Sequence, residues 1–374
     1  MTKGAILLSA GGTGGHLFPA EALAHELGAR GWSVHLATDR RAERYAGGFP
    51  ASAIHPISSA TFGSRNPIAI ARAFWTIWRG AREASKLIGA LKPRAVVGFG
   101  GYPTLPPLWA ATRRGVPTII HEQNAVMGRA NKALAARVNA IAGGFLKAAG
   151  PHAAKIVEIG NPVRPAVLAV ADTPFAAPAR DDAINILVFG GSQGARFFSD
   201  MVPDAIGGLP GDIRSRLRVV QQARPEDEAR VSARYAELGI RADVSPFFPD
   251  LPAHMAAAHL VISRAGASTV LELSVIGRPS ILVPLPHALD DDQGHNAQIL
   301  VEAGGALMRR QATIDASSLA ADIASLIGEP GRLAAMASGA RSVGRTDATR
   351  LLADLTEVIA SGESVDEYKK GARP

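Results

Sequence analysis

Two segments of this chain follow the same order: a short apolar run, a glycine-rich loop and a helical stretch. The first loop reads Ala10-Gly11-Gly12-Thr13-Gly14-Gly15, and the second reads Phe189-Gly190-Gly191-Ser192-Gln193-Gly194. A glycine loop lets backbone N–H groups come close to an anion, and the N-terminus of the following helix carries partial positive charge. The repeated order predicts two βα units, each suited to binding a phosphate group.

Both halves of the chain continue as an alternation of apolar runs with helical patterns. The apolar runs predict buried strands over residues 3–9, 34–38, 95–99, 117–121, 184–189, 217–221, 260–263 and 280–283. Helices are predicted over 19–30 and from Asn66-Pro67, a good N-cap and first helical position, to near Lys92. The alternation predicts an α/β fold with two doubly wound parallel sheets.

A proline-containing stretch, Gly160-Asn161-Pro162-Val163-Arg164-Pro165, separates the two halves. Proline stiffens the chain and removes backbone donors, which suits a hinge. A length of 374 residues is typical of two domains. We predict an N-terminal domain over 1–162 and a C-terminal domain over 163–340, with a helix near 341–358 that could pack back on the first. The last dozen residues, mostly charged or small, are expected to fray.

The composition excludes several kinds of protein. The chain has no cysteine, which rules out disulfides, a thiolate nucleophile and cysteine-ligated metals. It also lacks an apolar run of the roughly 18 to 20 residues that a membrane-spanning helix needs. The expected location is therefore the cytoplasm, with no segment that crosses a membrane.

Charge is distributed unevenly along the chain. Residues 44–157 carry fifteen Lys or Arg but only two acids, Glu83 and Glu122, whereas the net charge of the whole chain is +7. The remainder is therefore acidic. A positive first half favours an anionic partner such as a phosphate-bearing ligand or an acidic membrane surface.

Residues 62–82 contain four arginines, no acid and two of the four tryptophans. Aromatic and aliphatic side chains edged by arginine describe a segment that can lie in a bilayer interface. Ordinary core packing is the alternative, and nucleic acid is not expected because no RNA- or DNA-binding motif accompanies the charge. The residues assigned to the membrane surface are Ile68, Arg72, Phe74, Trp75, Trp78 and Arg79.

The glycine loops by themselves leave the chemistry open. Neither has the G-x-G-x-x-G spacing of dinucleotide-binding proteins or the lysine of a P-loop. The second also satisfies G-x-S-x-G, the nucleophile elbow of α/β-hydrolases. A serine hydrolase is therefore an alternative hypothesis, although it does not explain the glycine loop and the histidine of the first half. Its triad would use Ser192, with Asp250 or Asp290 and His287 or His295.

His16 closes the first loop at the carboxyl end of the first predicted strand. A neutral imidazole at that edge could take a proton from a hydroxyl nucleophile. The alternative is a histidine that only caps the helix expected to begin near Pro19.

Several polar residues of the second half could bind hydroxyl groups of a sugar. Residues 290–292 are three consecutive aspartates, which could hold Mg²⁺, but their place before a helix favours capping. Gln293 and Asn296 lie on one face of that helix, where amides could bind sugar hydroxyls. Glu272 is an isolated acid in an apolar stretch; it suits the two hydroxyls of a ribose, and a structural carboxylate fits nearly as well.

Together these motifs resemble the MurG family of peptidoglycan glycosyltransferases, in the same order and over residues 11–297. The matching residues are Gly11-Gly12-Thr13-Gly14-Gly15-His16, Gly100-Gly101-Tyr102, His121-Glu122-Gln123-Asn124, Gly160-Asn161-Pro162-Val163-Arg164, Gly190-Gly191-Ser192-Gln193-Gly194-Ala195, Arg264-Ala265-Gly266-Ala267-Ser268-Thr269 with Glu272, and Gln293 to Asn296-Ala297.

The resemblance implies a GT-B fold, with two Rossmann-like domains around a cleft, and an inverting glycosyltransferase. The expected reaction moves GlcNAc from UDP-GlcNAc to the C4 hydroxyl of the MurNAc-pentapeptide carried on undecaprenyl pyrophosphate. No tightly bound cofactor and no metal are expected. The expected location is peripheral, on the cytoplasmic face of the bacterial plasma (inner) membrane.

The resemblance also assigns individual roles. His16 is the expected general base. The expected contacts are Thr13, Gly14, Gly15 and Asn124 for the acceptor and transferred sugar; Arg164 and Ser192 for donor groups; the backbone near Phe248 and Arg264 for the uracil; Ala267, Ser268, Thr269, Val270 and Leu271 for the diphosphate; Glu272 for the ribose; and Gln293 and Asn296 for GlcNAc.

The chain departs from the family pattern at one place. Many relatives have Asp-His-Gln where this chain has Asp291-Asp292-Gln293, so the resemblance implies no diphosphate contact from a histidine at position 292. His295 is not expected to replace that histidine, because its side chain would point elsewhere on the turn. A third hypothesis is a sensor that binds the sugar nucleotide without transferring the sugar.

Overall fold

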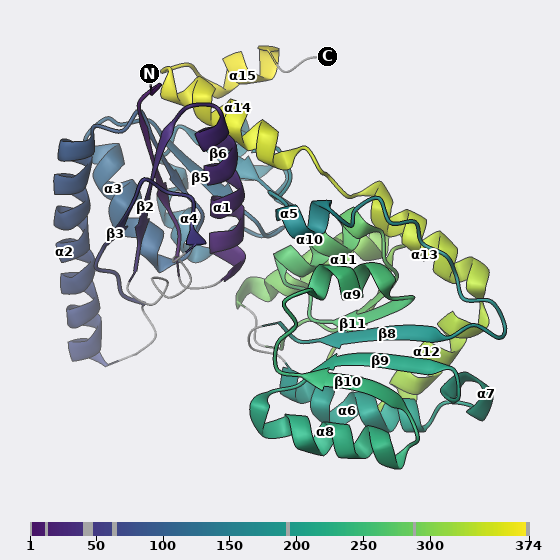
Figure 1. Cartoon of the computed structure of the whole chain (residues 1–374). Helices are drawn as coiled ribbons and strands as arrows, with labels where there is room; N and C mark the ends of the chain where they lie inside the picture. Colours follow the sequence, from purple (N-terminus) through teal and green to yellow (C-terminus); the bar gives the residue numbers. More distant parts are fainter. Residues whose placement is uncertain are drawn as a thin grey trace. The chain divides into compact units, whose positions relative to one another are not determined.

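The computed structural model describes residues 2–11, 14–39, 48–61, 66–191, 195–286 and 289–371. The chain divides into two compact units, each with its own parallel sheet (Figure 1). Unit 1 comprises Met1–Arg164 and Thr346–Pro374, and unit 2 comprises Pro165–Arg345.

Unit 1 is built on a seven-stranded sheet with the strand order β3-β2-β1-β4-β5-β6-β7. All of its neighbouring strands run parallel. The strands are β1 (Ala5–Ser9), β2 (Ser33–Thr38), β3 (Ala53–Pro56), β4 (Ala95–Gly98), β5 (Thr118–Glu122), β6 (Ala140–Gly143) and β7 (Ile156–Glu158). The helices are α1 (Gly14–Ala29), α2 (Pro67–Leu91), α3 (Leu105–Arg113), α4 (Arg129–Ala135), α14 (Ala348–Ala360) and α15 (Val365–Gly371), with 3₁₀ turns at Tyr102–Thr104 and Gly150–Lys155.

Alternate residues of β1 supply the cores on the two faces of this sheet. Ile6 and Leu8 pack in one cluster with residues of α1 and α14. Leu7 packs in another with residues of α2, α3 and α4. Because successive side chains of a strand point to opposite faces, a strand buried on both faces is a continuous apolar run. The first half of the chain therefore folds as a doubly wound layer.

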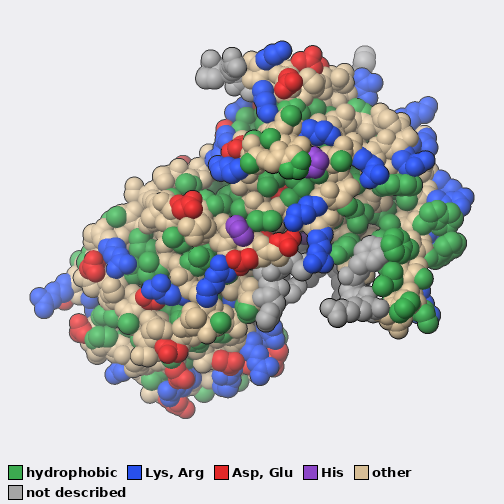
Figure 2. Space-filling model, turned by 180° about the vertical axis from the view of Figure 1, so that it is seen from behind, with side chains coloured by type: hydrophobic (Ala, Val, Ile, Leu, Met, Phe, Trp, Pro, Cys, Tyr) green, Lys and Arg blue, Asp and Glu red, His purple; other side chains and the backbone are tan. Residues whose placement is uncertain are grey.

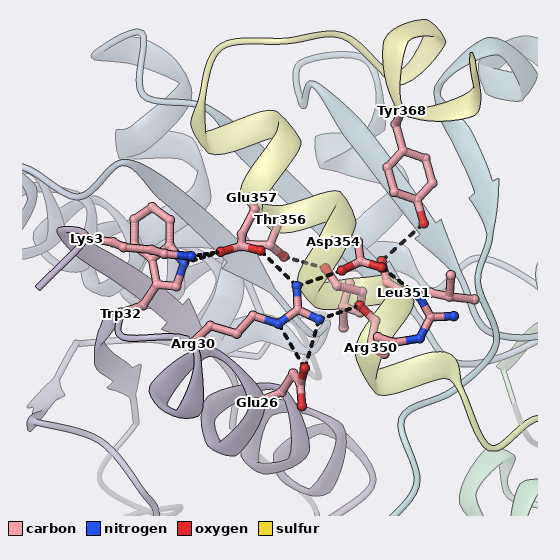
Figure 3. Close-up of polar contacts among 11 residues, drawn as sticks. Lys3, Glu26, Arg30, Trp32, Arg350, Leu351, Asp354, Thr356, Glu357 and Tyr368 are labelled. Atoms are coloured by element: carbon pink, nitrogen blue, oxygen red, sulfur yellow. Dashed lines mark hydrogen bonds and ion pairs between the residues drawn. The ribbon is translucent and has the colours of Figure 1, made fainter. Parts of the chain in front are cut away.

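The end of the chain returns to unit 1 as α14 and is held there by a polar cluster around Arg30, the residue after α1 (Figure 3). The Arg30 guanidinium lies 2.6 Å from Asp354, 2.8 Å from Glu357 and 2.8 Å from Glu26. Trp32 Nε1 donates to Glu357 at 2.7 Å. This cluster joins the first helix to a helix more than 300 residues later.

Unit 2 has a six-stranded parallel sheet with the order β10-β9-β8-β11-β12-β13. One face is covered by α6, α8 and α12, which share a core cluster with β8 and β9. The strands are β8 (Ile184–Phe189), β9 (Leu217–Gln222), β10 (Arg241–Ser245), β11 (Leu260–Ser263), β12 (Ser280–Leu282) and β13 (Ala306–Met308). The helices are α5 (Pro165–Leu168), α6 (Ala195–Gly207), α7 (Gly211–Arg214), α8 (Pro225–Glu237), α9 (Leu251–Ala257), α10 (Ala267–Ile276), α11 (Asp292–Glu302), α12 (Ala316–Gly328) and α13 (Pro330–Ser342).

Two local predictions were wrong. The first helix begins at Gly14 rather than near Pro19, because a proline in an early turn removes only one intrahelical hydrogen bond and the rest of this 16-residue helix outweighs that loss. The chain end does not fray over α15, because Val365 and Tyr368 are buried in the core of unit 1.

Candidate functional site

The loops after β1 and β4 meet at His16 in unit 1. His16 lies in the first turn of α1, and its ring rests on the backbone of Gly100 and Gly101, the residues that follow β4. A Cβ at Gly100 would lie 3.3 Å from the ring, and one at Gly101 would lie 3.5 Å from it. Both glycines have positive φ, +85° and +75°. Only glycine adopts this backbone without strain, and a Cβ at Gly100 would in addition crowd the imidazole.

Burial keeps His16 neutral. Burial lowers the pKa of His16 to about 4, against the opposing effect of a hydrogen bond with the backbone of Gly11. At neutral pH the imidazole is therefore uncharged and has one nitrogen able to accept a proton. The predicted alternative, a histidine outside the helix that caps its start, does not fit because His16 is part of α1.

A second histidine, His121 near the end of β5, is fully buried close to this site. Its Nε2 lies 3.3 Å from the carbonyl oxygen of Gly160, and its ring packs against Phe99. Burial, together with the nearby His16, lowers the pKa of His121 to about 4, against the opposing effect of the hydrogen bond with the Gly160 backbone. Both imidazoles are thus neutral members of one polar cluster at the carboxyl edge of the sheet.

Glu122 organises the loop that carries Asn124. This carboxylate is buried at the end of β5 and accepts four hydrogen bonds. One oxygen accepts from the backbone and side-chain N–H groups of Asn124, both at 3.1 Å, and the other from Gly128 N and Asn131 Nδ2, both at 2.8 Å. Burial raises the pKa of Glu122, and these donors oppose the rise. Glu122 is not among the predicted site residues, although an acid within a buried strand was the available signal.

The predicted hinge, residues 160–165, also makes contacts at the carboxyl edge of the unit 1 sheet. Asn161 is buried, and its Nδ2 donates to the carbonyl of Gln123 at 3.0 Å. Gln123 in turn donates to the carbonyl of Phe99 at 2.9 Å. The Arg164 guanidinium stacks 4.7 Å from the centre of the Phe18 ring. The predicted residues His16, Asn124 and Arg164 therefore all belong to unit 1.

In unit 2, the start of α10 presents backbone N–H groups. Gly266 is the N-cap in extended conformation, and as a glycine it has no side chain that could cap this end of the helix. The first-turn residues Ala267, Ser268 and Thr269 are partly exposed. Unsatisfied N–H groups and the helix dipole make such an end a ready anion site. The side chains of Val270 and Leu271 are buried, so these two residues could reach an anion only through their backbone.

Glu272, in the second turn of α10, and Asn296, on α11, are buried polar residues. Gln293 Oε1 accepts from Ala265 N at 3.2 Å and from Leu285 N at 3.0 Å. Asn296 Nδ2 donates to Ala265 O at 3.3 Å. Both predicted amides therefore hold the backbone of the loop before α10, an arrangement that spacing alone did not indicate.

Arg264, in the loop before α10, makes hydrogen bonds to the loop that follows β12. It is buried, donates to the carbonyls of Val283 and Pro284 at 3.1 and 3.2 Å, and bonds Gln311 at 2.7 Å. Its burial lowers the pKa of the guanidinium to about 10, which leaves it charged at neutral pH. Phe248 lies in a different loop, with its ring edge-on to His254.

The aspartates lie at the start of α11, where capping was predicted, and Asp292 Oδ1 accepts from Gln293 N at 2.8 Å. Asp291 is the N-cap of α11; its carboxylate pairs with Arg310 at 2.5 and 2.7 Å, and a hydrogen bond from the backbone of Gly294 in the first turn also lowers its pKa. Asp290 and Asp291 both have left-handed backbone, with φ of +57° and +51°. In this conformation Asp291 can reach Arg310, which lowers the pKa of the Asp291 carboxyl. Within the described part of the chain, no three His, Asp or Glu side chains are grouped so that they could hold a metal ion.

Three residues named for a binding site or a catalytic triad lie outside the described residues: Thr13, Ser192 and His287. Of the other residues named for a hydrolase triad, His295 contacts the backbone carbonyl of Asp291, and Asp250 pairs with His254 at 3.3 Å.

An apolar surface lies on α2 of unit 1. Hydrophobic side chains gather over this helix at the right edge of Figure 2, with Lys and Arg beside them. Trp75 and Trp78 stack with ring centres 4.8 Å apart, and Arg82 lies over Trp78. We define the α2 patch as the exposed hydrophobic residues Ile68, Phe74, Trp75 and Trp78. These residues are 45% to 65% exposed.

The structure extends this surface beyond the prediction. Trp109 on α3, which packs beside α2, is also exposed, and Arg113 lies 5.0 Å from its ring. Arg79, which was assigned to the membrane surface, pairs with Glu83 at 3.0 Å. Among helices in the described residues, none combines the length and the apolar character needed to cross a bilayer.

Two family models cover most of the chain. Residues 6–143 match the glycosyltransferase family 28 N-terminal domain, and residues 185–352 match the glycosyltransferase family 28 C-terminal domain. These ranges contain the loops of unit 1 around His16 and the loops of unit 2 around α10.

Full-length relatives carry one name, UDP-N-acetylglucosamine–N-acetylmuramyl-(pentapeptide) pyrophosphoryl-undecaprenol N-acetylglucosamine transferase. The protein of this name from Mesorhizobium japonicum is 65% identical over the whole of both chains. That from a Chelativorans species is 64% identical over 98% of each chain.

Solved structures agree with this match. MurG of Acinetobacter baumannii aligns with a TM-score of 0.77 and 29% identity, covering 95% of this chain and 99% of that one. The calicheamicin glycosyltransferase CalG4 aligns with a TM-score of 0.64 at 17% identity, covering 96% of this chain and 99% of that one, a likeness of fold alone.

Proposed function

Because this chain belongs to the MurG family of glycosyltransferases, we propose that it transfers GlcNAc from UDP-GlcNAc to the MurNAc-pentapeptide on undecaprenyl pyrophosphate, a step of peptidoglycan synthesis. The observation that carries this function is the 65% identity over the full length of a relative with that name. The family and the fold predicted from the sequence, two Rossmann-like domains of the GT-B type, are confirmed. None of the matches favours a serine hydrolase.

We assign the donor to unit 2. Displacement at the anomeric carbon leaves negative charge on UDP, and the N–H groups at the start of α10 can stabilise that charge without reorganising. Glu272 is the acid suited to the ribose hydroxyls. Gln293 and Asn296, which already hold the loop before α10, would shape the sugar site through that loop as well as by direct contact.

We assign the acceptor to the polar edge of unit 1. In the proposed step, a ring nitrogen of His16 takes the proton of the C4 hydroxyl as that oxygen bonds to the anomeric carbon. The bond from this carbon to the UDP oxygen breaks, and UDP leaves with the electron pair. A single displacement inverts the anomeric centre. Glu122 holds the Asn124 loop that would face the acceptor.

We further propose that unit 1 binds the cytoplasmic face of the bacterial plasma membrane through the α2 patch. Exposed tryptophans beside arginine side chains suit the headgroup region of an anionic leaflet. The proposed acceptor is a polyprenyl lipid, which would be reached from that surface.

The transfer reaction can be tested with purified protein. UDP should be released from UDP-GlcNAc only when a lipid-linked MurNAc acceptor is added, and the product should gain one GlcNAc. Binding of UDP-GlcNAc without transfer to this acceptor would instead support the sensor hypothesis. Release of UDP that does not depend on the acceptor would contradict the proposed reaction.

His16→Ala tests the proposed base. A positioned base contributes roughly 10²- to 10⁴-fold to rate, so kcat should fall by about that factor. His25→Ala is the matched control, because His25 is an exposed histidine on the same helix and should leave kcat unchanged. Normal turnover by the His16 variant would remove His16 as the base.

A further inference from the structure

Gln222 lies between two loops of unit 2. Its side chain has no role among the predicted site residues or in the proposed function. It is the last residue of β9, which runs between β8 and β10 in the sheet. Its backbone pairs in register with Ser245, the last residue of β10. The side chain is partly buried, and from this position it reaches the first residue beyond each neighbouring strand.

The Gln222 amide makes one hydrogen bond to each loop. Its Oε1 accepts from the backbone N–H of Gly190 at 3.2 Å, and its Nε2 donates to the carbonyl of Pro246 at 3.2 Å. Gly190 opens the glycine loop after β8, and Pro246 opens the loop that contains Phe248. Among side chains of this length, only an amide offers an acceptor and a donor on one carbon. The two partners also fix which way the amide points.

These bonds lie beyond the sheet ladder and are not needed for strand pairing. The β9–β10 pairing already extends to Gln222 and Ser245, and Ala223 N continues it by donating to the Ser245 carbonyl at 3.1 Å. The neighbouring Gln221 differs, because it is buried and accepts from Tyr235 on α8 at 2.5 Å. The Gln221 side chain is therefore hydrogen-bonded within the core, whereas the Gln222 side chain connects two loops.

We propose that Gln222 is a positioning residue that sets the spacing of the Gly190 loop and the Pro246–Phe248 loop, and thereby the affinity for the uridine end of the donor. The inference rests on the proposed function, with the donor in unit 2, and on the expectation from the family resemblance that the backbone near Phe248 frames the uracil. Gln222 acts through these two loops, and no contact between its side chain and the nucleotide is required.

Gln222→Met and Gln222→Glu test this role in the full-length enzyme. Met removes both bonds, whereas Glu keeps the acceptor for Gly190 but places an oxygen against the Pro246 carbonyl. Two lost neutral hydrogen bonds predict a rise in the KM for UDP-GlcNAc, and in the inhibition constant of UDP, of roughly 5- to 30-fold for Met. The value of kcat and the KM for the lipid acceptor should change less than about twofold. Gln222→Glu should raise the same two constants.

A control separates positioning from loss of stability. Tyr235→Phe removes the Gln221 hydrogen bond in the core and should leave every KM unchanged, because a lower folded fraction reduces the apparent kcat and not the KM. An equal rise of donor KM in Tyr235→Phe would overturn the inference.

The same measurements distinguish failure of the Gln222 inference from failure of the proposed function. If the unaltered enzyme transfers GlcNAc and Glu272→Gln raises the donor KM, a Gln222→Met enzyme with unchanged KM and UDP inhibition overturns only the inference. If the unaltered enzyme transfers nothing, or if neither variant affects the donor, the function or the donor site itself is wrong.

Discussion

At the scale of single residues, the polar edge of unit 1 depends on groups that are kept neutral or fully hydrogen-bonded. His121 is buried among apolar and backbone groups, so protonating it would place an isolated charge in the interior. Glu122 avoids a similar cost because four N–H groups surround its oxygens. The glycines at 100 and 101 are required for a different reason, since both have positive φ and a Cβ at Gly100 would come within 3.3 Å of the His16 ring.

The histidine environment predicts how stability depends on pH. The pKa of His121 is lowered by burial to about 4, against an ordinary value of 6.5, so between these values the unfolded chain binds more protons. Unit 1 should therefore lose stability as pH falls from about 6.5 to 4. Replacing His121 with Gln should reduce the loss between pH 7 and pH 5 by about 2 kcal/mol.

Urea unfolding followed by tryptophan fluorescence measures this effect, because all four tryptophans, at positions 32, 75, 78 and 109, belong to unit 1. His25→Gln, at an exposed position on α1, serves as the control and should keep the pH dependence of the unaltered protein. An unchanged pH slope in His121→Gln would show that another group causes the acid sensitivity.

At the scale of elements, unit 1 is completed by a helix from the far end of the chain. Leu352, Leu355 and Ile359 of α14 pack into the same core cluster as β1 and α1. The ion pairs of Arg30 with Asp354 and Glu357 lie at the edge of this contact (Figure 3). Burial disfavours the charge on Glu357, but hydrogen bonds from Trp32, Lys3 and Arg30 prevail and lower its pKa to about 2. The cluster thus stabilises the docked helix at neutral pH.

Glu357→Gln should weaken this docking. We expect a loss of about 1 to 3 kcal/mol at pH 7, because a partly buried Arg30 loses one of its carboxylates. Since the pKa of Glu357 in the folded state is depressed, its contribution is present above the ordinary value of 4.5 and is lost as pH falls toward 2. Hydrogen exchange over residues 348–371 should therefore speed up in the variant at pH 7.

Glu158→Gln is the matched control for Glu357. It breaks a more exposed ion pair of unit 1, with Lys147 at 3.1 Å, and a pair of this kind contributes about 1 kcal/mol or less. Equal effects of the two substitutions on exchange over 348–371 would contradict the role of the Arg30 cluster.

At the scale of the whole molecule, positive charge and exposed aromatic side chains coincide in unit 1. The basic stretch over residues 44–157 lies within it, as does the α2 patch. The patch supplies apolar area, and the surrounding charge supplies attraction to anionic lipid. Neither feature alone distinguishes a membrane surface from other partners.

Vesicle flotation tests this combination. Binding should require anionic lipid, weaken with added salt and fall several-fold in Trp75→Ala/Trp78→Ala, because the double variant loses apolar area that enters the interface. Arg72→Ala/Arg82→Ala should weaken binding further at low salt. Arg218→Ala/Arg241→Ala provides the charge-matched control in unit 2, where both arginines are exposed. Binding that is indifferent to lipid charge and to both tryptophans would refute the membrane proposal.

The sequence by itself determined the family, the α/β class and the strands that are buried on both faces, because such strands are continuous apolar runs next to glycine loops. It did not indicate β3, β6, β7, β10 and β13, which have only three to five residues each. Among them, β10 is an edge strand with exposed residues, and β6 reads Ala-Ile-Ala-Gly, so neither has an apolar pattern of useful length. These strands form because a neighbouring strand offers them hydrogen bonds.

Tertiary structure alone decided which polar side chains serve other residues of the site. Gln293, Asn296 and Gln222 bond to backbone groups of loops from other elements, and Glu122 joins its own loop to α4. Such bonds depend on which strands are neighbours in the sheet. Local sequence preferences do not specify which strands become neighbours, because contacts between distant segments exist only after the sheet has formed.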